Sequence, residues 1–299
     1  MSSRSEDVLE VDGRRVKVSN RDKVLWPAAG VTKGQMIDYY LAAASALLPH
    51  LSGRPVTLRR FPDGVERENW FQTQCPPGRP DWVPTHRMTG ARGQVYDTCM
   101  IEDRAALAWA ANLAAIELHP LLGRSDDFEK PDFVVFDLDP GPKADLLDCC
   151  RVAIRLREYL DERGFAPRAK TSGSVGLHVY AVTEASTFAE TREFARRLAQ
   201  SLALAEPLLI TDRKEASGRA GKVLIDWSQN AAAKSMIAPY SLRGTGWPTV
   251  STPVGWEEIE RSLAEARPER LVFEPAAVLE RLDRSGDLFE VFLGAGGEV

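Results

Sequence analysis

The chain has 299 residues, of which 44% are hydrophobic and 27% charged; this composition is typical of a globular protein and excludes a disordered or fibrous chain. No apolar run reaches the roughly 20 residues that a membrane helix needs, and the N-terminus has no apolar signal core, so we expect a cytoplasmic protein without a membrane partner. The net charge of −5 argues at first against a nucleic-acid partner. The four cysteines form no CxxC motif or Cys/His cluster, and we expect reduced thiols.

The charges are distributed unevenly along the chain. Residues 13–60 contain nine Lys or Arg and two Asp or Glu, whereas residues 256–299 contain eleven acids and five bases. A single basic face that binds nucleic acid would account for this division. Charges scattered over the whole surface would account for it equally well.

The N-terminal part is predicted to form a hairpin, a helix, a strand and a second helix. Apolar alternation surrounds an Asp-Gly turn, Thr32 is a good N-cap, and an Ala-rich segment is apolar on most sides. The expected ranges are 8–18 for the hairpin, 32–48 for the first helix, 55–61 for the strand and 103–119 for a buried helix.

Strands and helices alternate after residue 131. We expect strands at 133–139, 168–171, 177–182 and 222–227, and helices at 144–163, 188–204 and 276–284. This order predicts an α+β fold with a mixed sheet. We expect one domain over 1–299, in which an α/β N-terminal module of about 1–130 precedes a catalytic core of about 131–299.

Three aspartates stand at the ends of apolar strands. Asp137 and Asp139 are two residues apart, so both side chains point to one face of the sheet, and Asp226 ends another strand. Neighbouring carboxylates repel each other unless a cation lies between them, and their hard oxygens suit Mg²⁺ or Mn²⁺. If the two strands are neighbours, the three acids can hold two metals, one at a 3′-hydroxyl and one at a triphosphate. The other interpretation is that Asp-x-Asp before Pro-Gly only shapes a turn.

A loop of small residues joins the strands 168–171 and 177–182. Its glycines and hydroxyl residues can expose backbone N–H groups to a phosphate, and His178 can donate a hydrogen bond to a phosphate oxygen. A plain hairpin with a satisfied histidine is the commoner structure. Four cations near Asp226 would either neutralise phosphate charge or form surface ion pairs: Arg219, Lys222, Lys234 and Arg243.

Asn20, Lys23 and Lys33 belong to the basic N-terminal segment, and the pair Trp70-Phe71 follows two arginines. Basic residues with interleaved aromatics grip phosphates and stack on bases. Taken alone, an aromatic pair is more often part of a core.

Four motifs in matching order resemble the polymerase domain of bacterial ligase D, a member of the archaeo-eukaryotic primase superfamily. They are FDLDPG (136–141), SGSVGLHVY (172–180), RAGKVLIDWSQN (219–230) and IAPYSLRG (237–244), and the likeness extends from SNRDKVLWP (19–27) to SGDLFE (285–290). The resemblance implies a primase-polymerase fold with a mixed or antiparallel, RRM-like catalytic sheet. It also implies a DNA-dependent nucleotidyl transferase that extends primer ends and fills short gaps in bacterial DNA repair.

The resemblance implies roles for individual residues. Asp137, Asp139 and Asp226 match the catalytic, metal-binding carboxylates. The nucleotide-binding positions are matched by Ser172, Gly173, His178, His119, Arg219, Gln229 and Arg243. The pocket for the 5′-phosphate at a DNA gap or break is matched by Asn20, Lys23 and Lys33, and the aromatics that stack on template bases by Trp70 and Phe71.

Cofactors and partners follow from the same resemblance. We expect Mn²⁺ or Mg²⁺ at a two-metal site, NTP or dNTP with a preference for ribonucleotides, and DNA gaps or ends that carry a 5′-phosphate. Ku and a separate DNA ligase are expected partners in end joining, and excision repair is the alternative pathway. The native-looking start and the C-terminal helix favour a stand-alone protein over an excised domain.

Two positions depart from the pattern of the family. Val175 stands where these domains usually have lysine, which removes one phosphate contact and puts nucleotide preference or efficiency in doubt. The aromatic pair is Trp-Phe rather than the commoner Phe-Phe.

Two other functions are compatible with parts of the sequence. The Asp-x-Asp motif is similar to the start of haloacid-dehalogenase-like phosphohydrolases, in which the first Asp is a nucleophile. That family would place the motif near the N-terminus and a Thr or Val at Pro140, and this chain does neither. A non-catalytic module that binds DNA ends is the second alternative.

Overall fold

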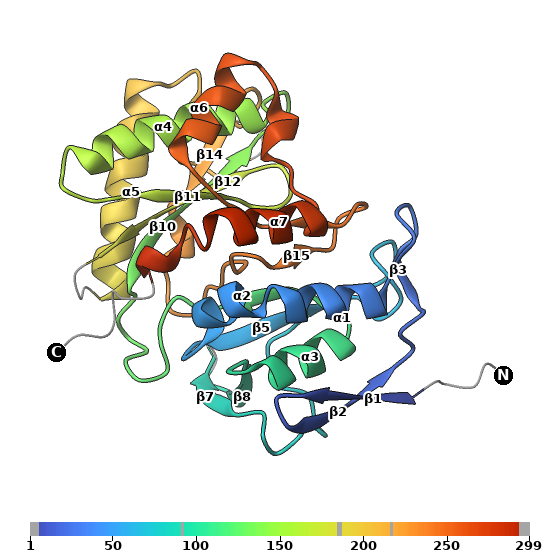
Figure 1. Ribbon diagram of the computed structural model, residues 1–299. Helices are drawn as coiled ribbons and strands as arrows, with labels where there is room; N and C mark the ends of the chain where they lie inside the picture. The colour runs from blue at the N-terminus through green and yellow to red at the C-terminus, as the bar shows by residue number, and fades with distance from the viewer. Residues whose placement is uncertain (1–5, 91–92, 184–186, 216–217, 293–299) are drawn as a thin grey trace.

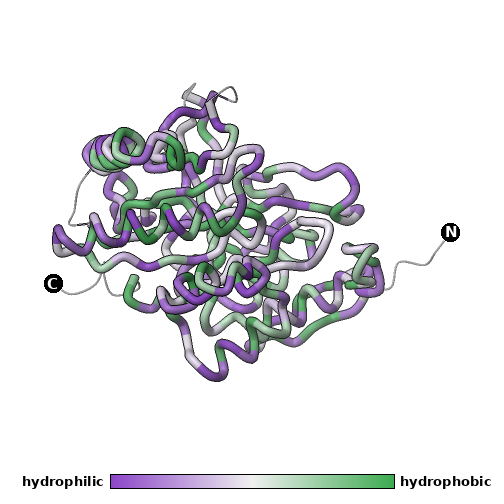
Figure 2. Tube along the Cα trace, turned by 90° about the horizontal axis from the view of Figure 1, so that it is seen from above, coloured by the Kyte–Doolittle hydropathy of each residue, from purple (hydrophilic) through white to green (hydrophobic). Residues whose placement is uncertain are grey.

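The computed structural model describes residues 6–90, 93–183, 187–215 and 218–292 (Figure 1). Two α/β layers lie against each other. The N-terminal half holds one sheet with α1, α2 and α3, and the C-terminal half holds a second sheet with α4, α5 and α6 (Figure 1). Helix α7 (Pro275–Ser285) lies between the two halves. Hydrophobic and hydrophilic stretches alternate along the helices, as expected for helices that bury one side (Figure 2).

The N-terminal half begins as predicted. The hairpin of β1 (Glu6–Val11) and β2 (Arg14–Ser19) turns at Asp12-Gly13, and Thr32 caps the next helix, whose Gln35 completes a capping box. The single helix expected to Leu48 is instead two helices that meet at Ala43. The short strands and helices of this segment are β3 (Val24–Trp26), β4 (Val31–Thr32), α1 (Lys33–Ala42) and α2 (Ala44–Leu51).

A five-stranded sheet follows, in the order β6-β5-β8-β7 with β9 paired to β5. The helix expected over 103–119 is wrong beyond Asn112, because Ala114 takes a positive φ of 57° that ends the helix and the chain continues as a strand paired with β5. His119 therefore lies on a strand. The elements are β5 (Pro55–Arg60), β6 (Trp70–Gln72), β7 (Thr85–Thr89), β8 (Val95–Met100), α3 (Arg104–Asn112) and β9 (Ala115–Pro120).

Two cysteines of this half are bonded to each other. Cys75 and Cys99 form a disulfide with their Cα atoms 4.9 Å apart, so the expectation of four reduced thiols is wrong for this pair. Sequence spacing gave no sign of it, because the two residues are brought together only by the pairing of distant segments. Cys149 and Cys150 are free, as expected, and both are buried.

The C-terminal half contains a six-stranded sheet in the order β13-β14-β10-β12-β11-β17. All pairings are antiparallel except β13 with β14, which confirms the mixed sheet. The main elements are β10 (Phe133–Pro140), α4 (Leu146–Asp161), β11 (Arg168–Thr171), β12 (Leu177–Val182), α5 (Phe188–Ala205), β13 (Ile210–Thr211) and β14 (Val223–Asp226). The remainder are β15 (Leu242–Arg243), β16 (Thr249–Val250), β17 (Pro253–Val254) and α6 (Trp256–Ala264).

Strand β10 has two different faces. Val134, Phe136 and Leu138 pack under α4 and α5 in the core of this half. The alternate residues, including Asp137 and Asp139, point to the opposite face, as the two-residue period requires. Asp137 and Asp139 thus lie on the face of the sheet that α4 and α5 do not cover, beside the smaller apolar cluster that contains Val135 and Tyr180.

The core of the N-terminal half also takes in residues from the C-terminal half. Ala238, Tyr240, Leu242, Val250 and Val278 are buried together with the side chains of α1, α2 and α3. The two halves share buried surface, and the boundary near residue 130 stays a prediction. Within the described ranges no helix is long and apolar enough to cross a membrane.

Candidate active site

Four polar residues form a row across the face of the six-stranded sheet that lies opposite α4 and α5. In the strand register, Lys170 on β11 lies opposite His178 on β12, His178 opposite Asp137 on β10, and Asp137 opposite Asp226 on β14. The Nε2 atom of His178 is 3.2 Å from a carboxylate oxygen of Asp137. Asp137 and Asp226 are thus neighbours on adjacent strands, as the metal-site hypothesis requires.

Asp137 in this row and Asp139, two residues further along β10, are carboxylates whose ionisation is opposed by their surroundings. Burial and the charge of Asp226 raise the pKa of Asp137 to about 6. Burial and the charge of Asp137 raise the pKa of Asp139 to about 6 as well. Asp226 thus makes ionisation of Asp137 harder, and Asp137 makes ionisation of Asp139 harder, which is the condition that a bound cation relieves.

Asp226 is 5% exposed and has three protein partners. Lys214 donates to one of its oxygens at 2.7 Å, Gln229 to the same oxygen at 3.0 Å, and Ser228 to the other at 2.7 Å. Gln229 also reaches Asp137 at 3.4 Å and so ties the two acids together. With these partners in place, no group of three or more His, Cys, Asp and Glu among the described residues converges closely enough to hold a metal. The donor set nevertheless fits a hard divalent ion, since it consists of mutually repelling carboxylates.

The loop after β11 is more closed than predicted. The hydroxyl of Ser172 accepts hydrogen bonds from the backbone N–H groups of Ser174 (3.2 Å) and Gly176 (3.1 Å), so these two groups are not free to bind phosphate. Gly173 has a φ of +71°, and a Cβ there would lie 2.6 Å from the Cγ atom of Arg243. Glycine is therefore needed for the loop to pack against Arg243.

A second row crosses the five-stranded sheet. Phe71 on β6 lies opposite Arg59 on β5, and Arg59 opposite Glu117 on β9. His119 is two residues further along β9, and its Nε2 atom is 2.8 Å from Glu117. Burial lowers the pKa of His119, although Glu117 opposes this shift. Arg243, on β15, reaches Glu117 at 3.4 Å and so connects the second row to the loop after β11.

The two rows border a cleft of about 370 Å³, a size within the usual range for a small-ligand site. The cleft brings together many predicted residues: Phe71, His119, Asp137, Asp139, Ser172, His178, Gln229 and Arg243. Val175, Lys234 and Met236 also line it. Asp226 and Arg219 are not part of its described lining but are hydrogen-bonded to it: Asp226 accepts from Gln229 at 3.0 Å, and Arg219 donates to the carbonyl of Asp139 at 3.2 Å. Lys222 instead borders a separate groove beside α5.

The predicted 5′-phosphate residues lie together outside the cleft. The backbone N–H of Lys23 donates to the carbonyl of Asn20 and that of Lys33 to the carbonyl of Lys23, which folds the loop onto the start of α1. Burial, then Lys23 and Arg60, lowers the pKa of Lys33 to about 8. The ammonium of Lys33 donates to the carbonyl of Ser19 at 2.7 Å. Lys23 forms an ion pair with Asp63 at 2.6 Å.

The aromatic pair faces two directions. Phe71 is 56% exposed and lines the cleft, with Arg59 packed 5.1 Å from its ring centre. Trp70 is 40% exposed and packs against Arg60, on the side of Lys33. The alternative interpretation, in which the aromatic pair belongs to a hydrophobic core, is wrong here, since both rings have exposed surface.

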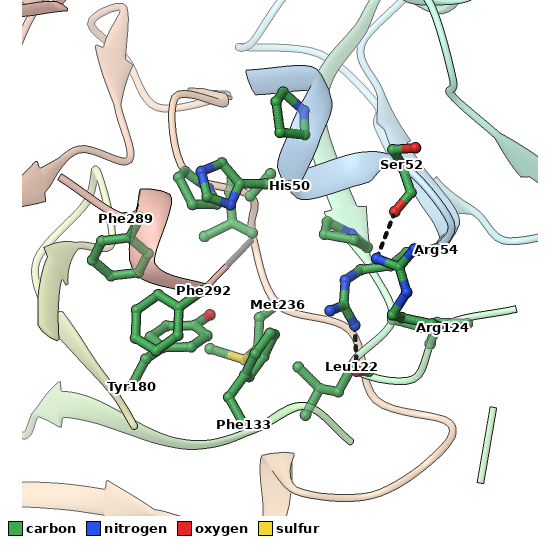
Figure 3. A pocket seen from close by; sticks show the side chains of 16 residues that line it. His50, Ser52, Arg54, Leu122, Arg124, Phe133, Tyr180, Met236, Phe289 and Phe292 are labelled. Carbon is green, nitrogen blue, oxygen red and sulfur yellow. Dashed lines mark hydrogen bonds between the residues drawn. The ribbon is translucent and has the colours of Figure 1, made fainter. Parts of the chain in front are cut away.

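A second cavity, of about 240 Å³, lies on the other side of Met236 and Ile237, which line both hollows. Figure 3 shows its aromatic wall of Phe133, Tyr180, Phe289 and Phe292 facing Arg54 and Arg124. It contains none of the predicted site residues.

Sequence reasoning missed four residues of the site: Lys170, Lys214, Ser228 and Glu117. Lys170 is fully buried, and burial lowers its pKa well below the usual value. Ser228 is next but one to Asp226, a position from which it could have been suspected. Glu117 lies inside the segment mistaken for a helix, so its alternation with His119 went unrecognised.

Comparison with known proteins gives a consistent picture. The sequence pattern of the family described as LigD, primase-polymerase domain, matches residues 32–289. The multifunctional non-homologous end joining protein LigD of Mycolicibacterium smegmatis is 42% identical over 277 residues, which cover 92% of this chain and 35% of that protein. The multifunctional non-homologous end joining DNA repair protein LigD of Mycobacterium tuberculosis is 39% identical over 93% of this chain and 37% of its own length.

A solved structure shows the same fold. The polymerase domain of Mycobacterium tuberculosis ligase D in complex with DNA superposes with a TM-score of 0.87 at 36% identity, and the match covers 94% of this chain and 98% of that one. The chain spans little more than a third of the length of these curated relatives. The predicted fold and the nucleotidyl-transferase class of enzyme are confirmed, and the chain belongs to the LigD primase-polymerase domain family.

Proposed function

We propose that this protein extends DNA primer ends and fills short gaps, using Asp137, Asp139 and Asp226 to hold Mn²⁺ or Mg²⁺. The observation that carries the proposal is the register that sets Asp137 between Asp226 and His178 beside a cleft also lined by Arg243. When bound, the two ions would stabilise the charge of the attacking and leaving oxygens in phosphoryl transfer. Family membership leaves no place for the phosphohydrolase alternative.

The chain's own residues would bind and orient the nucleotide. Arg243 and Lys234 provide positive charge on the cleft wall for the triphosphate, and His119 and His178 also line the cleft. Ser172 and Gly173 would act mainly by shaping the loop against Arg243. Arg219 would orient the strand end through the carbonyl of Asp139, and Gln229 would align the two acids before the metal arrives.

The DNA side would be the basic loop and the aromatic pair. Lys33, Lys23 and Asn20 would hold the 5′-phosphate at the downstream side of a gap, since like charges crowded at this point are stabilised by an anion. Phe71 and Trp70 would stack on template bases with their exposed faces. We further propose that the protein acts in end joining with Ku and a ligase, or in excision repair, and that it prefers ribonucleotides. These are proposals because the chain matches only 35% of the length of a relative whose name includes end joining.

Primer extension on gapped DNA tests the proposal. A one-nucleotide gap with a 5′-phosphate should be filled with Mn²⁺ or Mg²⁺, and faster than the same gap with a 5′-hydroxyl. NTP and dNTP in parallel reactions measure sugar preference. A wild-type protein that binds the gap but adds no nucleotide would support the non-catalytic end-binding alternative instead.

A further inference from the structure

One buried carboxylate lies between the DNA side and the nucleotide side of the site. Glu117 is 1% exposed and accepts hydrogen bonds from His119 (2.8 Å), Arg59 (3.2 Å), Arg243 (3.4 Å) and the backbone N–H of Gly244 (3.0 Å). It is absent from the described lining of the cleft, so it acts on a substrate only through the residues that it holds.

Glu117 is held in its ionised form. Burial alone would raise its pKa, but the hydrogen bond from His119 and the charges of Arg243 and His119 outweigh burial and lower the pKa to about 2. Its charge balances those of two half-buried arginines, Arg59 and Arg243, which both donate to it. Removing such a charge leaves the cations unpaired and free to move apart.

The DNA side of this carboxylate is Arg59. The guanidinium of Arg59 is 5.1 Å from the ring centre of Phe71 and 5.2 Å from that of Phe61, so the exposed ring of Phe71 rests on Arg59. Phe71 also meets His119 edge-on, with ring centres 5.3 Å apart. A base that stacks on Phe71 therefore presses on a side chain that Glu117 holds.

The nucleotide side of this carboxylate is Arg243. Its side chain lies between Glu117 and Gly173, where there is no space for a Cβ atom. The next residue, Gly244, donates its backbone N–H to Glu117 as well. The position of Arg243 in the cleft is thus fixed from behind by Glu117.

We propose that Glu117 is a positioning residue that couples stacking of the template on Phe71 to binding of the nucleotide by Arg243 and His119. This inference rests on the proposed polymerase function and deepens it. Coupling between two ligands is reciprocal, so DNA should tighten nucleotide binding and nucleotide should tighten DNA binding by the same factor. We expect this factor to be roughly 10-fold, within the usual range for coupled sites.

The main test is Glu117→Gln, which keeps the shape of the side chain and removes its charge. With saturating gapped DNA, we expect KM for the nucleotide to rise about 10-fold and kcat to change less than about 3-fold, since the metal-binding acids are untouched. The matched control is Glu258→Gln. Glu258 also accepts from an arginine, Arg281, and from a glycine N–H, Gly255, but it lies outside the cleft. Glu258→Gln should keep the KM and kcat of the wild type.

A second variant separates coupling from structural damage. Arg59→Gln leaves Arg243, His119 and Glu117 in place and removes the connection from Phe71 to Glu117 that runs through Arg59, while the edge-on contact of Phe71 with His119 remains. Nucleotide affinity, measured by fluorescence titration in Ca²⁺ without DNA, should stay within about 2-fold, while the tightening caused by DNA should weaken. The variant that carries both Glu117→Gln and Arg59→Gln should keep as much coupling between DNA and nucleotide binding as Glu117→Gln alone. If the two substitutions instead reduced this coupling independently, so that their effects added, the proposal would be overturned.

The outcomes separate the two proposals. A wild-type protein that does not extend primers refutes the polymerase function. Suppose instead that the wild type extends primers, while Glu117→Gln melts at an unchanged temperature and keeps its KM and its DNA coupling. That result refutes only the role of Glu117. If Glu117→Gln does not fold, Arg59→Gln decides, since unchanged coupling in that variant refutes the inference.

Discussion

The two aspartates of β10, Asp137 and Asp139, and the basic loop before α1 are opposite in charge, but in both regions burial and neighbouring like charges shift the pKa values. In the first, burial and neighbouring acids raise the pKa of Asp137 and of Asp139 to about 6. In the second, burial and neighbouring cations lower the pKa of Lys33 to about 8. Both regions hold like charges closer together than water alone would favour.

The difference lies in how each region is built. The acids project from strands whose register is fixed on both sides, whereas the lysines depend on backbone contacts within a loop. Lys23 also has an exposed partner, Asp63, that a phosphate can displace. We infer that the rigid region performs chemistry and the loop region binds, because chemistry requires tighter geometry than binding does.

Removing one acid should produce the largest effect. Asp137→Asn should lower primer extension by roughly 10³-fold or more, because metal-held charge stabilisation contributes several kcal/mol. DNA binding should change little, and the melting temperature without metal should stay equal or rise, since a repulsion is lost. Extension assays, gel shifts and thermal melts measure the three quantities. An Asn variant with normal extension would remove Asp137 from the site.

The same acids should make stability depend on pH. A folded-state pKa of about 6 for Asp137 exceeds the value near 4 of an unfolded chain, so its stabilising contribution is complete below about pH 4 and is lost as pH rises through 6. Without metal, the free energy of unfolding should fall over this window by on the order of 2 kcal/mol relative to Asp137→Asn. Urea unfolding at several pH values tests this, and Mn²⁺ should restore the wild type at pH 7. Parallel curves for the two proteins would contradict the prediction.

The basic loop should respond more weakly. Lys33→Met should reduce affinity for a gap with a 5′-phosphate by roughly 10-fold and leave a 5′-hydroxyl gap unchanged, since one charged hydrogen bond is lost. The preference of the wild type for phosphate should decline above pH 8, as Lys33 loses its proton. Lys17→Met, at an exposed position on β2, is the matched control in fluorescence anisotropy. Equal losses on both gaps would mean that Lys33 does not read the phosphate.

The smallest expected effect concerns Val175, which is 62% exposed on the cleft. Val175→Lys should lower KM for the nucleotide about 3-fold by adding one exposed charge near the triphosphate. Val95→Lys, at a position 60% exposed outside the cleft, should not. Steady-state extension kinetics distinguish the two variants. An unchanged KM in Val175→Lys would show that the positive charge already present in the cleft is enough for nucleotide binding.

The sequence predicted elements better than it predicted contacts. The strand that carries Asp137 and Asp139 could be recognised from its apolar residues and period, and the capping of α1 from Thr32. The pairing of β10 with both β12 and β14 could not be derived, because paired residues such as Leu138 and Leu177, or Asp137 and Asp226, are far apart in the sequence and register is a tertiary property.

The error at residues 103–119 has a physical reason. Alanine favours a helix locally, but pairing with β5 and the contacts of Glu117 with Arg59, Arg243 and His119 favour a strand after Ala114. Local propensity predicted the first half of the segment correctly and tertiary contacts determine the second half. For the same reason the Cys75–Cys99 bond and the partners of Asp226 were not foreseen.

The apolar residues of β10 have a consequence for engineering this protein. Phe136 and Leu138 never touch the cleft, yet a one-residue slip of β10 would turn Asp137 toward α4 and bring an aliphatic side chain to the reaction face. Such a slip would change neither the amino-acid composition nor the secondary-structure content of the protein. The buried apolar residues of the strand therefore fix its register and, with it, the positions of the aspartates on the opposite face. Libraries that vary these core residues will also vary the orientation of the aspartates.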